Sequence, residues 1–175
     1  MARKTISINR APVLTLWGAV VARRLGFDED EALTLGKAVA GLNAQAKGRR
    51  LGIFKPHETK PNKAREKETG KRFLVEIVGR PVPAMSTDQG IRAVQRGKPI
   101  APDSVRQYLE GKFGDNLSIV RAALRKLARA YRPQQLAHEA YALYERFRPE
   151  IPAGKRGWGA AGDLDLAQID KLAKK

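Results

Sequence analysis

The stretch that decides the fold covers residues 11–47 and reads APVLTLWGAVVARRLGFDEDEALTLGKAVAGLNAQAK. Its first half predicts a helix, because proline suits the first turn and apolar residues recur in a wide stripe at helical spacing. Gly26 ends that helix, and Asp28 with Glu31 spells a capping box that begins a second helix. The apolar stripe of the first helix consists of Val13, Leu14, Leu16, Trp17, Val20, Val21 and Leu25.

Two helices joined by a short turn invite comparison with a helix-turn-helix DNA reader. A recognition helix places polar and basic side chains at its N-terminus, facing the bases. Here that end carries four consecutive carboxylates, Asp28–Glu31, which would repel phosphate. We therefore expect a packed αα-hairpin, with the helix-turn-helix as the alternative. The small residues expected to let the two helices approach closely are Gly36, Ala40, Gly41 and Ala44.

The next segment, Lys47–Arg72, is strongly basic. It carries ten Lys and Arg against three Glu, a local charge of +7 within a chain total of +16. Pro56 and Pro61, together with few apolar residues, argue against a packed helix through its middle. We expect an exposed basic arm or loop that orders on contact with a partner.

The rest of the chain predicts one strand and a series of helices. Phe73–Val78 is rich in β-branched and aromatic residues, which is typical of a strand. Residues 79–83 are expected to break that strand in a turn, although Gly79-Arg80-Pro81 also resembles the core of a minor-groove AT hook. The helices predicted after this turn are Asp88–Arg96, Pro102–Phe113, Asn116–Tyr131, Pro133–Arg148 and Leu166–Ala173.

These elements predict a mostly α, compact multi-helix domain of about six helices. A chain of 175 residues is ordinarily one domain and buries a sizeable core. We divide it into an N-terminal αα-hairpin over residues 1–46, the basic arm over 47–72 and a C-terminal helical part over 73–175. A short strand or hairpin is expected around 73–78, and Thr5–Asn9 alternates weakly, as a short edge strand would.

One predicted helix, Asn116–Tyr131, carries a row of arginines. Arg121, Arg125, Arg129 and Arg132 follow one another at spacings of four, four and three residues. Such spacing places all four along one helical face, beside the apolar stripe. This row is the second concentration of positive charge after the arm.

The aromatic residues near the C-terminus allow two interpretations. Tyr131, Tyr141, Tyr144 and Phe147 recur with leucines at helical spacing, which favours core packing over stacking on bases. Trp158 lies between glycines and basic residues. We expect it to anchor its loop, with base stacking as the alternative.

No catalytic or metal-binding signature occurs. The chain has no cysteine, and neither His57 nor His138 has a second His or Cys at ligand spacing. Residues 157–162 spell G-x-G-x-x-G, but a proline-broken segment precedes them where the dinucleotide fingerprint needs a strand. We predict no catalytic residues, no cofactor and no metal. An enzyme that uses the glycine-rich loop around Trp158, close to His138, is a further alternative.

The clustered basic charge favours a polyanionic partner. We expect a non-catalytic protein that contacts nucleic acid through phosphates, DNA ahead of structured RNA because no RNA-module signature appears. Little sequence specificity is expected, because no helix presents base-reading side chains at its N-terminus. The alternative is a protein–protein adaptor whose basic arm docks on an acidic partner. The predicted nucleic-acid-binding residues are Lys47, Arg49, Arg50, Lys55, Lys60, Lys63, Arg65, Lys67, Lys71, Arg72, Arg121, Arg125, Arg129 and Arg132.

Nothing in the sequence predicts a membrane partner. The N-terminus lacks the apolar region of a signal peptide, and the longest mostly apolar run, Ala11–Ala22, is shorter than the roughly 20 residues of a spanning helix. We expect a cytoplasmic or nucleoid-associated protein. The oligomeric state is left open.

Overall fold

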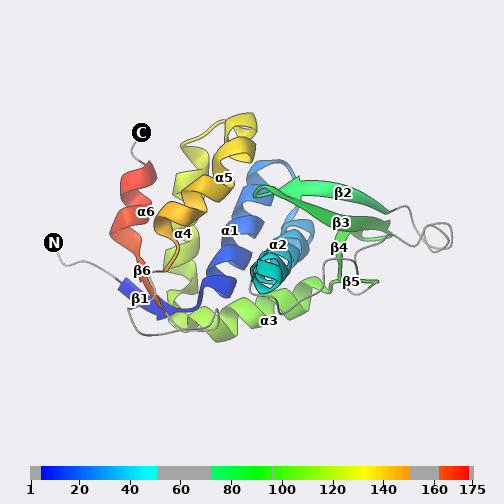
Figure 1. Cartoon of the computed structure of the whole chain (residues 1–175), viewed down its shortest axis with the longest axis horizontal. Helices are drawn as coiled ribbons and strands as arrows, with labels where there is room; N and C mark the ends of the chain where they lie inside the picture. The colour runs from blue at the N-terminus through cyan, green and yellow to red at the C-terminus, as the bar shows by residue number, and fades with distance from the viewer. Residues whose placement is uncertain (1–4, 51–71, 96, 150–161, 174–175) are drawn as a thin grey trace.

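The structure is a computed structural model that describes residues 5–50, 72–95, 97–149 and 162–173, without the side chains at 43–50 and 72. Within these ranges the central helix is α1 (Arg10–Arg24), and the other helices are arranged around it (Figure 1). The helices that contact α1 are α2 (Glu29–Arg50), α3 (Pro102–Phe113), α4 (Leu117–Arg129) and α5 (Pro133–Phe147). The short helix α6 (Leu166–Ala173) packs against α4 and α5.

The predicted fold class is wrong in its β-content. The described residues form two antiparallel sheets, which lie at opposite ends of the molecule in Figure 1. The smaller sheet pairs β1 (Thr5–Ile8) with β6 (Gly162–Asp165). The larger sheet has the order β2 (Arg72–Ile77), β3 (Arg80–Thr87), β4 (Gly90–Gln95) and β5 (Lys98–Pro99). The fold is therefore α+β, with six helices and six strands in the part of the chain that is described.

The helix predicted over Asp88–Arg96 is wrong: the described part of this segment, to Gln95, is a turn followed by β4. Thr87 organises the turn, since its hydroxyl accepts from the Gln89 backbone N–H at 3.2 Å and donates to the Gly90 carbonyl at 2.7 Å. Gly90 adopts φ +120°, which suits glycine alone. The sheet forms because β4 pairs with β3 and packs on α2, contacts that helical spacing within the segment does not reveal.

The strand break predicted at residues 79–83 is too long. Val78 and Gly79 alone form the turn, with φ +49° and +72°, and β3 begins at Arg80. Pro81 and Pro83 lie within β3, opposite β2 and outside its ladder with β4, which starts at Ala84. Their missing N–H groups therefore remove no bond on the β4 side, and proline is tolerated where a strand has one neighbour. The turn is preferred to the AT-hook interpretation.

The αα-hairpin is confirmed, because α1 and α2 cross in close contact at Gly18 and Gly36. A Cβ built on Gly18 would lie 2.8 Å from the Gly36 Cα, a distance that only glycine permits. Trp17 is fully buried beside this crossing and donates from Nε1 to the Ala140 carbonyl at 2.9 Å. Every residue from Pro12 to Ala22 is buried, so α1 is the core of the molecule.

The other predicted helices are found with small shifts at their ends. α3 and α6 match their predicted bounds. α4 begins at Leu117, after a short 3-10 turn over Gly114–Asn116, and it ends at Arg129. α2 continues to Arg50, so the first four residues of the predicted arm are helical. Arg72, the last residue of the predicted arm, begins β2, while residues 51–71, with His57, and residues 150–161, with Trp158, lie outside the described residues.

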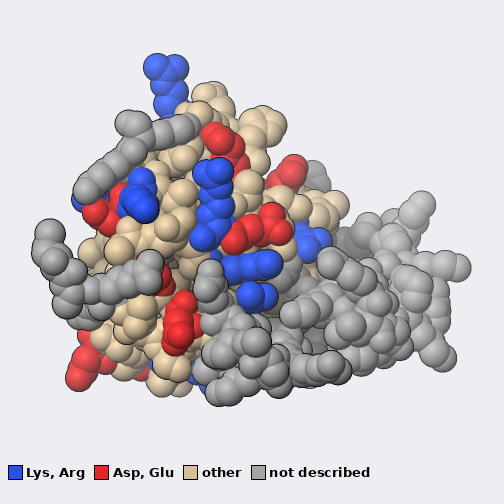
Figure 2. Space-filling model, turned by 60° about the vertical axis from the view of Figure 1, so that its left-hand side comes forward, with Lys and Arg blue, Asp and Glu red and all other residues tan. Residues whose placement is uncertain are grey.

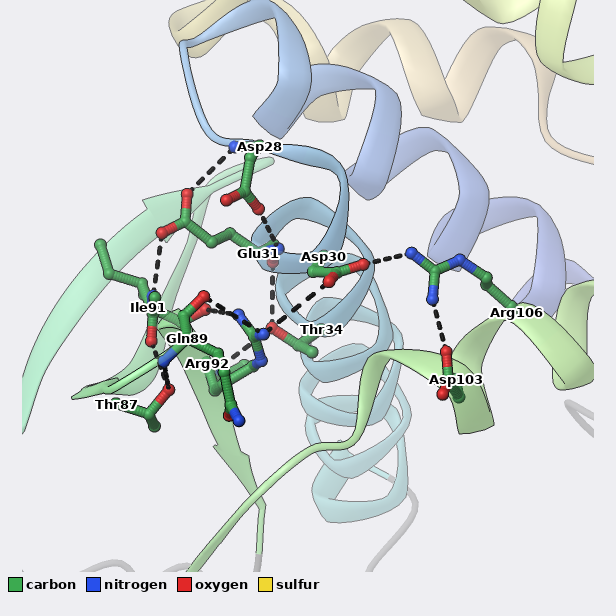
Figure 3. Close-up of polar contacts among 12 residues, drawn as sticks. Asp28, Asp30, Glu31, Thr34, Thr87, Gln89, Ile91, Arg92, Asp103 and Arg106 are labelled. Carbon is green, nitrogen blue, oxygen red and sulfur yellow. Dashed lines mark hydrogen bonds and ion pairs between the residues drawn. The ribbon is translucent and has the colours of Figure 1, made fainter.

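The N-terminus of α2 supplies hydrogen bonds to β4 (Figure 3). The predicted capping box is present: the Asp28 N–H donates to Glu31 Oε1 at 3.0 Å, and the Glu31 N–H donates to Asp28 Oδ1 at 2.8 Å. Glu31 Oε2 also accepts the Ile91 N–H at 2.8 Å, and the buried Thr34 hydroxyl accepts the Ala93 N–H at 3.0 Å. Side chains of α2 thus accept hydrogen bonds from backbone N–H groups of β4. The strand β5 pairs only with Val94 and Gln95 of β4, so these donors lie outside that pairing.

Glu31→Ala is expected to lower the free energy of unfolding by about 1–3 kcal/mol, because it removes a helix cap and leaves the half-buried Ile91 N–H without its acceptor. Urea titration measures this change. Glu145→Ala, at an exposed position of α5, is the matched control and should stay within about 0.5 kcal/mol of the parent. Equal effects of the two substitutions would contradict the bridging role of Glu31.

Candidate nucleic-acid interface

Five arginines from α1 and α4, with Arg106 of α3 at one end, line a series of adjoining pockets, called here the arginine groove. Arg23 and Arg24 come from the last turn of α1, and Arg121, Arg125 and Arg129 come from α4. Three adjoining pockets make up the groove. Val20, Arg23 and Arg125 line both of the first two pockets, while Glu29 and Arg121 line both of the last two. Arginines that are far apart in the sequence are therefore neighbours in space.

The packing of α4 on α1 explains this arrangement. The apolar stripe of α4 is buried, with Val120, Leu124 and Leu127 fully covered, and the arginines flank it at the helical spacing that the sequence predicts. In α1 the basic pair follows the last buried turn, where cations favour the negative end of the helix dipole. Since the C-terminal half of α4 lies beside the C-terminal turn of α1, the two sets of guanidiniums face a common space.

The five groove arginines from α1 and α4 differ in their pairing from Arg106 and Lys126. Within the described ranges none of the five forms an ion pair. Lys126, outside the groove, contacts Asp170 at 2.8 Å, and Arg106, which lines the far end of the groove, contacts both Asp30 and Asp103. The hydrogen bond that Arg106 donates to the Asp30 carboxylate is the main cause that raises the pKa of Arg106. Positive charge is thus left without ion pairs where α1 and α4 line the groove.

The two ends of the groove differ in charge. One end, of about 270 Å³, is lined by Val20, Ala128 and four arginines, with no carboxylate. The other end, of about 300 Å³, is lined by Glu29, Glu110, Leu117 and the arginines at 106 and 121. Figure 2 shows one face of the molecule with Lys and Arg side chains gathered near its centre and Asp and Glu side chains beside them. The face seen there is of mixed sign, whereas the lining of the first end of the groove contains no Asp or Glu.

The predicted arginine row is only partly brought together. Arg121, Arg125 and Arg129 share the groove, but Arg132 does not line it. Because α4 ends at Arg129, Arg132 has extended backbone, φ −68° and ψ 151°, at the N-cap of α5. The sequence reading missed Arg23 and Arg24, although a basic pair that closes an otherwise buried helix could have indicated them. The side chains of the predicted arm residues from Lys47 to Arg72 lie outside the described part of the chain.

The aromatic side chains of the C-terminal helices belong to the core. Tyr131, Tyr144 and Phe147 are buried, and Tyr141 is half-buried beside Tyr144. Burial is the main cause that raises the pKa of the Tyr144 phenol to about 12. The core interpretation of this cluster is confirmed. His138 is exposed on α5, and within the described ranges no group of three or more His, Cys, Asp or Glu side chains could hold a metal ion.

Comparisons with known proteins give no relative for this chain. No protein-family model, no curated protein and no solved structure matches it. Across the described residues, none of the helices has the length and apolar character needed to traverse a bilayer. The local chemistry of the groove is therefore the basis for proposing a function.

Proposed function

We propose that this protein is a non-catalytic nucleic-acid-binding protein that contacts phosphates, with DNA ahead of structured RNA. The observation that carries the proposal is the convergence of five arginines without ion pairs, from helices distant in sequence, in one groove. A guanidinium presents its donors in a planar fork that suits phosphate oxygens. The chain total of +16 adds a long-range attraction for polyanions.

The proposed contacts supply affinity and little sequence selectivity. Phosphate contacts fix the position of a protein on a duplex, while base edges specify sequence. The acidic N-terminus of α2, the position that a recognition helix would need, is engaged in contacts with β4 and Arg106. The basic arm Lys47–Arg72 is proposed as the primary contact on its charge alone, and the arginine groove as the secondary one.

The first prediction from this proposal is steep salt dependence of binding. Each phosphate neutralised by a cation releases counterions, so six to ten contacts lower the affinity roughly 10³- to 10⁵-fold between 50 and 200 mM salt. Fluorescence anisotropy with a labelled duplex of about 20 base pairs measures this change. An unrelated duplex of equal length should bind with similar affinity. An affinity that does not change across this range, or the absence of binding at low salt, would contradict the proposal.

A protein–protein adaptor is the second candidate, and exposed apolar residues favour it. Phe73 is 36% and Leu74 69% exposed, on β2, which is an edge strand next to the arm. Edge strands offer unpaired backbone groups to a partner. Reversing the arm charges at Lys60, Lys63 and Lys67 separates the candidates. Loss of nucleic-acid co-purification supports the first, whereas loss of a protein partner with nucleic acid retained supports the second.

A further inference from the structure

We propose that the carboxylate-free end of the arginine groove is a discrete site for a phosphate monoester, such as the 5′-terminal phosphate of a strand or a free nucleotide. This end, called here the arginine pocket, is lined by Arg23, Arg24, Arg125 and Arg129 over a floor of Val20 and Ala128. The inference goes beyond duplex binding, because an internal phosphodiester needs no pocket and can be held by an open row of cations.

One arginine of the pocket, Arg24, contains a donor without a partner. Among the described residues, Arg24 Nε is a buried side-chain nitrogen that has no hydrogen-bond partner. Leaving such a group without a partner is unfavourable, and native structures seldom do so without a reason. The same guanidinium is held in place from its other side, since Nη2 donates to the Tyr131 carbonyl at 2.9 Å. The Arg24 guanidinium is thus fixed in position beside the pocket, and its remaining N–H groups have no acceptor among the described residues.

The other three guanidiniums retain most of their hydrogen-bonding capacity. Arg23 donates one bond to the Phe27 carbonyl at 3.3 Å, and Arg129 donates one to the Arg125 carbonyl, also at 3.3 Å. The Arg125 side chain makes no hydrogen bond or ion pair with the described residues. Each guanidinium carries five N–H donors, so the backbone takes only a small share of those around the pocket.

The helix carbonyls nearby do not explain this excess of donors. At the end of α1, the backbone N–H groups of Leu25, Gly26 and Phe27 already bond the last carbonyls. At the end of α4, the N–H groups of Ala130 and Tyr131 do the same. The guanidinium bonds to the carbonyls of Phe27, Tyr131 and Arg125 add to this capping but use only part of the donors, and the described lining contains no carboxylate that the rest could pair with.

The charge of the pocket sets the class of ligand. Four cations within a volume of about 270 Å³ favour a group with two negative charges over the single charge of a phosphodiester. A phosphate monoester has its second pKa near 6 and is a dianion above that pH. It offers three oxygens, which match the paired N–H groups of guanidinium forks from two helices.

The test is a titration of the full chain with inorganic phosphate at pH 7.5 and constant ionic strength, followed by the Nε–Hε signals of arginine in ¹H–¹⁵N spectra. The Arg24 signal is assigned by its loss in Arg24→Lys. We expect it to shift saturably, and we expect Arg125→Ala to weaken binding about tenfold. Arg146→Ala, which removes an exposed arginine of α5 outside the pocket, should change affinity less than about twofold.

Two further comparisons identify the source of the phosphate. A 5′-phosphorylated oligonucleotide is compared with its 5′-hydroxyl twin, and adenosine 5′-monophosphate with adenosine. Preference for the phosphorylated strand alone assigns the pocket to strand ends, while equal preference for the mononucleotide assigns it to free nucleotides. Absence of a saturable shift at Arg24, no preference for either phosphorylated ligand, or equal weakening by Arg146→Ala would overturn the site. Duplex binding is scored separately, so its failure would leave this result unaffected.

Discussion

Gly36→Ala is expected to destabilise the protein by at least about 3 kcal/mol, a large part of the 5–15 kcal/mol that stabilises an ordinary domain. The Cβ added to Gly36 would lie 2.7 Å from the backbone nitrogen of Ala19 and closer still to the carbonyl oxygen of Thr15. Both atoms belong to the backbone of α1, so relief requires moving the helices apart. Separation would loosen the packing around Trp17 at the centre of the core. Thermal and urea unfolding followed by circular dichroism measures the loss.

The same substitution elsewhere supplies the control. Gly111 lies in α3, and a Cβ built there meets no atom within 4 Å. Because alanine has the higher helix propensity by about 1 kcal/mol, Gly111→Ala should stabilise the protein slightly. We expect the two variants to change the free energy of unfolding in opposite directions. If Gly36→Ala were neutral or stabilising, the close crossing of α1 and α2 would be wrong.

The double variant Arg125→Glu, Arg129→Glu is expected to lower duplex affinity at least about a hundredfold at 50 mM salt. Each reversal removes a charge-assisted bond worth roughly 1.5–3 kcal/mol and adds repulsion between a carboxylate and phosphate. Both side chains are exposed, and toward the described residues they form a single hydrogen bond, the 3.3 Å contact of Arg129 with the Arg125 carbonyl. The fold should therefore survive, and circular dichroism checks that it does.

The matched control reverses Arg132 and Arg146, which changes the net charge equally. Both are exposed, and neither lines the groove. We expect this variant to lose much less affinity, through the general field alone. If the two double variants weakened duplex binding equally, net charge alone would explain the affinity and the groove would have no special role.

The sequence predicts well what local pattern determines. The helix ends near Gly26 and Phe113 follow from glycine, and the Asp28–Glu31 capping box is present in full. The close approach at Gly36 was expected from small residues in α2. In each case neighbouring residues supply the physical cause, so one segment is enough to infer it.

The sequence did not predict the larger sheet, because the contacts that stabilise it join residues far apart in the chain. Residues 88–95 become a strand through β3 on one side and the Glu31 and Thr34 side chains on the other. Pro81 and Pro83 indicated a break, yet they are accommodated where β3 has a single neighbour. Strand preference depends mainly on such surroundings, which a single segment does not contain.

Only part of the candidate site could be predicted from the sequence, for the same reason. The spacing of Arg121, Arg125 and Arg129 predicts their common face from α4 alone. Their meeting with Arg23 and Arg24 depends on how α1 packs against α4, about a hundred residues away in the sequence. Arg132 satisfied the spacing but lies beyond the end of the helix, because the chain turns into α5.

The slope of the logarithm of duplex affinity against the logarithm of salt concentration tests most directly whether the arginine groove contacts phosphates. This slope counts the phosphates neutralised, at about 0.9 for each one on B-DNA. We expect Arg125→Ala with Arg129→Ala to reduce its magnitude by about 2 relative to the parent chain, uniformly across duplex sequences. An unchanged slope in that variant would show that the groove does not touch the nucleic-acid backbone.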